Sequence, residues 1–248
     1  MAQCRHLRHA PITEALVDLR AAPTVEFGGA EVLDRLKSAL SDRYPKYSER
    51  RAFEARLEVR KGQAFVPKGT DKGLHGHFFE SQDGRNVAQF RVDGFTYNRL
   101  APYTDGESVI TEALRLWELH AEVAQPLMVS RVALRYINTL KLPAQADIPT
   151  FLTHVPATPE GSPGDVQSFL TRVETLDVES GRRVITTQAL TPGMPPDSVN
   201  VVIDIDTFQM GDFGVSPGGL RPTLDGLREL KNAVFFGSIT EEGAKEFE

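Results

Sequence analysis

The chain has 248 residues, of which 40% are hydrophobic and 25% charged, and its net charge is −6. These values are typical of a soluble globular protein, and they exclude a membrane protein because no apolar run approaches the roughly 20 residues of a membrane-spanning helix. The basic N-terminus lacks the apolar stretch of a secretory signal, and the single cysteine, Cys4, excludes an intramolecular disulfide, so we expect a cytoplasmic protein.

Charge is unevenly distributed along the chain. Residues 1–143 contain 21 Lys and Arg against 18 Asp and Glu, a net +3, whereas residues 144–248 contain 7 against 16, a net −9. Nucleic-acid binding requires a basic surface, because phosphate contacts supply most of the affinity. The acidic second part therefore argues against a large nucleic-acid footprint. A small footprint in residues 1–143 stays open, beside the simpler explanation of solubilising surface charge.

The first part of the chain predicts a strand, a helix, three strands and a second helix. The strands show alternating apolar and polar residues, and the helices show apolar residues at helical spacing. The expected elements are a strand at 11–20, a helix at 30–44, strands at 53–60, 75–82 and 86–100, and a helix at 107–125.

Four local signals refine this first part. Asp83–Gly84 is a hairpin turn signal, and Gly94 interrupts the strand at 86–100, where we predict a bulge. Asp105 is suited to cap the following helix, and Trp117 is expected to anchor the core.

The second part repeats this order. We expect a strand at 129–142, a short helix at 148–154, a hairpin of strands at 165–178 and 182–190, a strand at 199–208 and a helix at 223–236. Glycine-rich residues 210–220 predict a loop or lid, and the polar tail after Gly237 is expected to fray.

The element order predicts an α+β fold of two similar β-α-β-β-β-α halves, residues 1–126 and 127–248. The halves are expected to form one pseudo-symmetric unit, with a largely antiparallel sheet and helices on one face. Only the order of elements repeats; the residues do not.

The face of the strands opposite their apolar residues collects charge. Its predicted members are Glu14, Asp18, Glu54, Arg56, Glu58, Arg60, Gln89, Arg91, Asp93, Arg131, Arg135, Asp204 and Asp206. They form either a solvated face with cross-strand ion pairs or a site that grips a polar ligand. For the second case the candidate ligand-binding residues are Arg91, Arg131, Arg135, Asp204 and Asp206, since charges inside apolar strands need partners.

Histidine, cysteine and aspartate residues supply weaker metal signals. His75 and His77 are spaced for one face of a strand, with Glu80 or the distant His120 as a third ligand, but surface histidines are the simpler interpretation. Asp204 and Asp206 have a spacing that suits Mg²⁺ or an ion pair. A second mixed group, in an N-terminal arm expected to be disordered, consists of Cys4, His6 and His9.

No catalytic constellation stands out. Ser238 and the other hydroxyls have no triad partners at a recognisable spacing. We therefore predict no catalytic residue, no cofactor and no metal.

Six segments, which span nearly the whole chain in order, carry a family resemblance. They are PITEALVDLR (11–20), YP (44–45), FRVDGFTYNRLAPY (90–103), LRYIN (134–138), VVIDIDTF (201–208) and LRELKNAVFFGSIT (227–240). Together they resemble a sporadically distributed, uncharacterised family of bacterial and archaeal proteins of similar length. The resemblance implies no activity, but the patchy distribution of the family implies mobile or defence-associated genes.

The repeated unit also resembles two-repeat saddle folds and, more loosely, tunnel-type triphosphate enzymes. Those enzymes carry Glu-x-Glu-x-Lys on their first strand, whereas this chain has Arg56 between Glu54 and Glu58. The departure argues against phosphohydrolase activity.

The main functional hypothesis is a non-enzymatic binding protein, an accessory or regulatory component of a defence or toxin–antitoxin-like system. Its expected partner is another protein or a second copy. The alternative is a nucleotide- or phosphate-binding protein, metal-dependent in one version, that uses the charged face to hold a small anionic ligand. A third hypothesis places a small molecule beneath the glycine-rich residues 211–219.

Overall fold

A single curved antiparallel sheet dominates the structure. The computed structural model describes residues 1–56, 68–164 and 166–248, and in this part of the chain nine strands form one sheet in the order β2-β3-β4-β5-β1-β6-β9-β8-β7. The strands are β1 (Ile12–Arg20), β2 (Lys46–Arg56), β3 (Lys68–Glu80), β4 (Asn86–Arg91), β5 (Gly94–Leu100), β6 (Val129–Pro143), β7 (Phe169–Leu176), β8 (Arg182–Pro192) and β9 (Ser198–Phe213).

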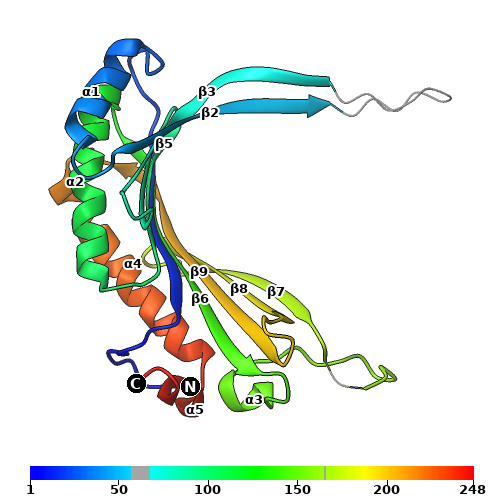
Figure 1. Cartoon of the computed structure of the whole chain (residues 1–248). Coiled ribbons are helices and arrows are strands. Elements are labelled where there is room, and N and C mark those ends of the chain that lie inside the picture. The colour runs from blue at the N-terminus through cyan, green and yellow to red at the C-terminus, as the bar shows by residue number, and fades with distance from the viewer. Residues whose placement is uncertain (57–67, 165) are drawn as a thin grey trace.

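The long helices cover one face of this sheet, as predicted. Figure 1 shows α1, α2 and α4 along the convex side, while the concave side faces away from them. The helices are α1 (Ala30–Leu40), α2 (Gly106–Ala124), α3 (Ile148–Phe151), α4 (Pro217–Ser238) and α5 (Glu241–Lys245). Among the described residues no helix combines the length and apolarity needed to cross a bilayer.

The core lies between the sheet and the helices. Leu19 on β1, Leu134 on β6 and Leu116 on α2 are completely buried there. Trp117 is buried as predicted, and its indole N–H donates to the carbonyl of Val215 at 2.8 Å. Alternation along the central strands sends every second side chain into this core, so the intervening side chains must lie on the concave face.

The predicted strand at 86–100 is wrong, because it is a hairpin. β4 and β5 pair with Arg91 opposite Gly94, so that Val92 and Asp93 form a two-residue turn. Gly94 has φ of 144°, and a Cβ there would lie 2.1 Å from the carbonyl oxygen of Leu19. Because Gly94 lacks a side chain, the chain can make a tight turn and a close contact with β1 at the position where we predicted a bulge. The first half therefore has one strand more than the second, and the predicted identical element order does not hold.

The β2–β3 pair also differs from the prediction. β2 starts at Lys46, well before residue 53, and β3 starts at Lys68, well before the predicted residue 75. The pairing contains register shifts, and Figure 1 shows the two strands projecting away from the body of the sheet. Without a core on one face, this segment has no regular alternation to reveal it. Residues 57–67, which include the predicted charges Glu58 and Arg60, lie outside the described residues.

The predicted glycine-rich loop is mostly regular structure. Met210 to Phe213 extend β9, and α4 begins at Pro217, capped by the Ser216 hydroxyl, which accepts from the Gly219 N–H. Gly211 lies within β9, because glycine can adopt the extended backbone of a strand as well as a turn. The third hypothesis required a loop above the ligand, but most of residues 211–219 belong to β9 and α4.

Both chain ends are held on the body, contrary to the expected disordered arm and fraying tail. The N–H of Ala2 donates to the carbonyls of Phe236 and Ile239, at 3.0 and 2.9 Å, and Leu7 is buried. α5 caps the end of the chain with Ala244 buried. The apolar Ala2, Leu7 and Ala244 share one small core cluster, which outweighs the polar character of these segments.

Candidate binding site on the concave sheet face

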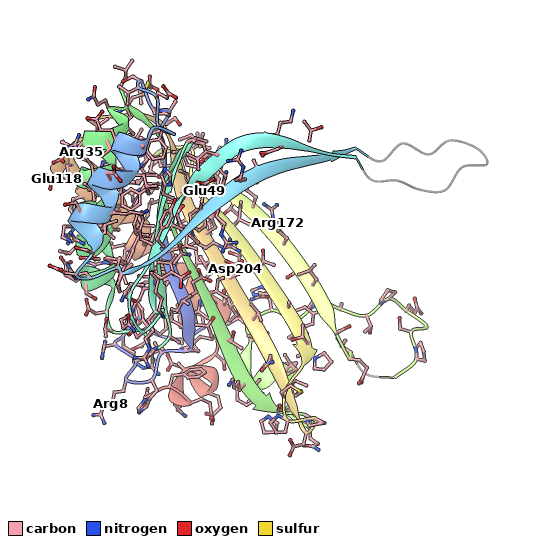
Figure 2. The ribbon with its side chains drawn as sticks, turned by 45° about the horizontal axis from the view of Figure 1, so that its top comes forward. Arg8, Arg35, Glu49, Glu118, Arg172 and Asp204 are labelled. Carbon is pink, nitrogen blue, oxygen red and sulfur yellow. The ribbon has the colours of Figure 1, made fainter. Side chains whose placement is uncertain are left out.

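Charged side chains meet on the concave face where β1, β5, β6 and β9 lie side by side. Residues directly opposite one another in an antiparallel pair point to the same face. Asp18 on β1 lies opposite Thr96 on β5, and Arg135 on β6 lies opposite Asp206 on β9. Figure 2 shows Asp204 on this side of the sheet, away from Arg35 and Glu118 on the helix side.

Asp18 is the centre of the group. Its carboxylate accepts from Arg91 at 2.8 Å, from the Thr96 hydroxyl at 2.8 Å and from Arg131 at 3.0 Å. Arg20 donates to the same carboxylate at 3.1 Å. A buried carboxylate with this many charge-assisted donors has both oxygens satisfied, which fixes the positions of the arginines around it.

Arg131 connects this centre to the next strand. Its guanidinium donates to both oxygens of Asp206, at 2.9 and 3.2 Å, and lies 4.5 Å from the ring centroid of Phe208. One planar guanidinium is thus shared between two carboxylates and stacked on an aromatic ring, an arrangement that lysine could not reproduce.

Arg135 and Asp204 form a second, more exposed pair. Nε of Arg135 donates to Asp204 at 2.7 Å, while 41% of the arginine side chain stays exposed. This hydrogen bond raises the pKa of Arg135. Beyond it, Arg172 of β7 lies on the same side of the sheet (Figure 2) and lines a small hollow of about 170 Å³ with both residues.

The two central carboxyl groups respond oppositely to their surroundings. Burial alone would raise the pKa of Asp18, but Arg91, Arg20, the Thr96 hydroxyl and Arg131 together lower it below the ordinary value. For Asp206 burial prevails over its arginine neighbours, and its pKa is raised. Asp18 therefore stays ionised at lower pH than an ordinary aspartate, whereas Asp206 is protonated more easily.

The group surrounds an open hollow of about 360 Å³. Its wall combines the charged residues with polar and apolar ones: Leu16, Asp18, Arg20, Gln89, Arg91, Thr96, Asn98, Arg131, Arg135 and Asp206. Gln89 donates to Asn98 at 2.7 Å, and Asn98 donates to Glu14. Every arginine of the hollow has a carboxylate partner, so the surface presents ordered donors and acceptors whose charges are paired.

All five residues predicted for ligand binding lie on this face. Arg91, Arg131 and Asp206 are joined through Asp18, and Arg135 with Asp204 forms the adjacent pair.

The central role of Asp18 was missed, although it belonged to the predicted charged face. Its position between the buried Val17 and Leu19 of β1 made the alternation visible in the sequence. Only the strand order shows that four donors converge on its carboxylate.

The predicted histidine pair is not brought together. A register shift beside His75 separates the two side chains: His77 contacts the rings of Phe27 and Tyr47, whereas His75 contacts Phe78. His120 is completely buried in the aromatic core. Within the described ranges no three His, Cys, Asp or Glu side chains are grouped as metal ligands would be. The carboxylates of Asp204 and Asp206 are each bound to an arginine instead.

Comparison with known proteins adds no family to this picture. No protein-family model matches the chain, and no curated protein matches it in sequence.

Proposed function

We propose that this protein is a non-enzymatic binding protein whose concave sheet face contacts a partner protein. The observation that carries the proposal is the arginine–aspartate network centred on Asp18, which is ordered and partly buried on the sheet face opposite the helices. Groups held in place before binding lose little conformational freedom when a partner docks. They also favour partners with a matching pattern of charge.

Apolar side chains on the same face support a protein as the partner. Leu170 and Leu176 on β7 are 73% and 47% exposed, and they share a face with Arg172 because they are two and four residues from it. Leu16 lines the central hollow. Arginine combined with exposed apolar side chains is the composition of protein interfaces.

The phosphate-binding alternative has less support. Arg91, Arg131 and Arg135 each donate to an aspartate, so much of their positive charge is already neutralised and a phosphate would have to share them with a carboxylate. The same aspartates would have to leave their arginines to hold a metal ion.

The wider role is also a proposal. The network spans β1 and β6, which belong to residues 1–126 and 127–248, so we propose that a partner is held where two related halves meet. An accessory or regulatory role in a cytoplasmic defence or toxin–antitoxin-like system follows from the family resemblance alone.

Site-specific photo-cross-linking tests this proposal. The photoreactive residue p-benzoylphenylalanine would replace Leu16 or Ile185 on the concave face, and Glu118 on the exposed side of α2 as the matched control. In the cells that produce the protein, discrete cross-linked products should form at Leu16 and Ile185 and not at Glu118. The same product from the purified chain alone would identify a second copy as the partner. Absence of products at both concave positions, or an equal yield at Glu118, would exclude this face as the binding surface.

A further inference from the structure

A second pocket lies on the helix side of the sheet, separate from the concave face. It has a volume of about 370 Å³ and is enclosed by the N-terminal arm, the start of α2 and one side of α4. Its floor includes Asn138 of β6, which is buried and donates to the Ile203 carbonyl at 3.0 Å. The pocket thus depends on the ordered arm that sequence patterns did not predict.

Lys231 of α4 lines this pocket and is its most unusual group. The residue is only 7% exposed, and its ammonium Nζ lies 3.9 Å from the ring centroid of Tyr136. Among the described residues this ammonium has no hydrogen-bond or ion-pair partner, whereas buried lysines ordinarily have one. Burial lowers the pKa of Lys231 to about 8. At neutral pH a cation is therefore held in a mostly buried position without a carboxylate in contact with it.

The surroundings favour an anion at this position. The positive end of the 19-residue helix α2 forms part of the wall through Asp105 and Gly106, and Arg228 of α4 lines it as well. Asp105 is engaged as the cap of α2, accepting from the Ser108 N–H at 2.7 Å. Its charge is therefore committed to the helix end and not to Lys231.

The other titratable groups of the wall come from the N-terminal arm, from α4 and from Tyr103, which precedes α2. Cys4 acts to raise the pKa of Lys231, although its effect is smaller than that of burial. Arg5, His6 and Glu229 also line the pocket, and Arg5 is paired with carboxylates at the end of the chain. These groups leave the ammonium of Lys231 as the buried charge that a ligand could neutralise.

Apolar residues form a further part of the wall, beside the polar Thr104 and Asn232. Leu7, Phe235 and Phe236 are buried residues that line the pocket, and Ile12 lines it as well. A bound molecule would therefore meet both charged and hydrophobic groups. Ligand sites commonly combine a mostly apolar wall with a few fixed polar groups.

We propose that this pocket binds a small organic anion, whose carboxylate or phosphate group contacts Lys231 and whose apolar part lies against Phe235 and Phe236. The anion supplies the partner that the buried ammonium lacks. This function is independent of partner binding on the concave face.

Calorimetric titration of the full chain at pH 7 tests the proposal with three probes of similar shape. Benzoate carries a carboxylate, phenyl phosphate carries a phosphate, and benzyl alcohol carries no charge. We expect at least one anion to bind, and the comparison of the two identifies the preferred group. Lys231→Met and Lys231→Gln should each weaken that binding by about tenfold or more, the loss of one charge-assisted contact. Arg35→Gln on the exposed side of α1 should leave it unchanged.

A second readout reports on Lys231 directly. In protein with ¹³C-labelled lysine, the NMR titration midpoint of the Lys231 side chain should move to higher pH when the anion is bound, because a neighbouring negative charge favours the ammonium. The proposal is overturned if neither anion binds, if benzyl alcohol binds as tightly, or if the Lys231 variants retain full affinity.

Discussion

The guanidinium of Arg91 donates to the carboxylate of Asp18 at 2.8 Å, and each side chain is only 9% exposed. Two opposite charges are thus held together on a sheet face that carries no helices. Burying such a pair costs desolvation energy, which a few well-aligned hydrogen bonds must offset. A role in positioning Arg131 and its neighbours for a partner would explain why the protein buries this pair.

Removing the charge of Asp18 should therefore strongly lower the stability of the folded protein. We expect Asp18→Asn to lower the free energy of unfolding by about 3 kcal/mol, because it removes the buried partner of Arg91 and Arg131 and leaves Arg91 only the more exposed Asp93. Urea denaturation measures the change. Arg20→Ala is the control: that side chain is 41% exposed, and its loss should cost less than about 1 kcal/mol. Equal effects of the two substitutions would show that Asp18 is not the centre of the network.

Gly94 gives a prediction about the hairpin between β4 and β5. Gly94→Ala should destabilise the protein by more than about 2 kcal/mol, because the new Cβ would meet the Leu19 carbonyl oxygen and the backbone has φ of 144°. Gly84→Ala is the matched control, since Gly84 also has positive φ but nothing lies within 4 Å of its added Cβ. Thermal unfolding of both variants separates the clash from the conformational effect. A smaller loss at Gly94 than at Gly84 would contradict the close contact with β1.

The strands around these residues show which features the sequence patterns could predict and which they could not. β1 and β6 were predicted nearly to the residue, because apolar and polar residues alternate along most of their length. The turn at Val92 and Asp93 was missed, and Gly94 was taken for a bulge. The turn shifts the core positions from Ala88 and Phe90 to Phe95 and Tyr97, and a bulge also shifts the alternation by one residue. Only the pairing of Arg91 with Gly94 reveals the hairpin.

His120 predicts a specific sensitivity to acid. Burial lowers its pKa to about 3, with Arg91 acting in the same direction, and both ring nitrogens lack hydrogen-bond partners among the described residues. Below pH 6.5 the unfolded chain gains a proton there that the folded chain does not, so stability falls as pH drops from 6.5 towards 3. At pH 4 this amounts to about 3 kcal/mol.

His120→Leu should remove that part of the pH dependence. Urea midpoints of the variant and the wild type, measured at pH 7, 5 and 4, should diverge increasingly in acid. Replacing the exposed His154 by Gln should leave the wild-type profile unchanged. Parallel profiles for His120→Leu and the wild type would mean that this imidazole is protonated in the folded protein.

Lys231 predicts a change at the opposite end of the pH range. Its folded pKa of about 8 lies below the ordinary 10.5, so the unfolded chain holds the extra proton between these values. Stability should therefore rise by about 3 kcal/mol as pH increases from 8 to 10.5. Lys231→Met should lack this rise and be more stable than the wild type at pH 7, whereas the exposed Lys245→Met should behave as the wild type. An identical rise in Lys231→Met would show that the ammonium is not buried.

The two sites differ in how far they could be predicted. Arg91, Arg131, Arg135, Asp204 and Asp206 were found because a charge inside an apolar strand is visible in a single sequence. Convergence on Asp18 depends on the strand order and register, which one sequence does not contain. Lys231 follows Leu224 and Leu227 at helical spacing, so a lysine on the apolar stripe of α4 was a usable signal. The pocket around it could not be predicted, because the N-terminal arm that encloses it has no periodic pattern.

The most direct test of the central claim is the yield of photo-cross-linked product at Leu16, compared between the wild type and Arg135→Glu. Arg135 is 41% exposed, so the protein should stay folded, as circular dichroism can verify. If the concave face binds a partner of matching charge, reversing this charge should reduce the yield by about tenfold. An unchanged yield in Arg135→Glu would contradict the claim that this charged face selects the partner.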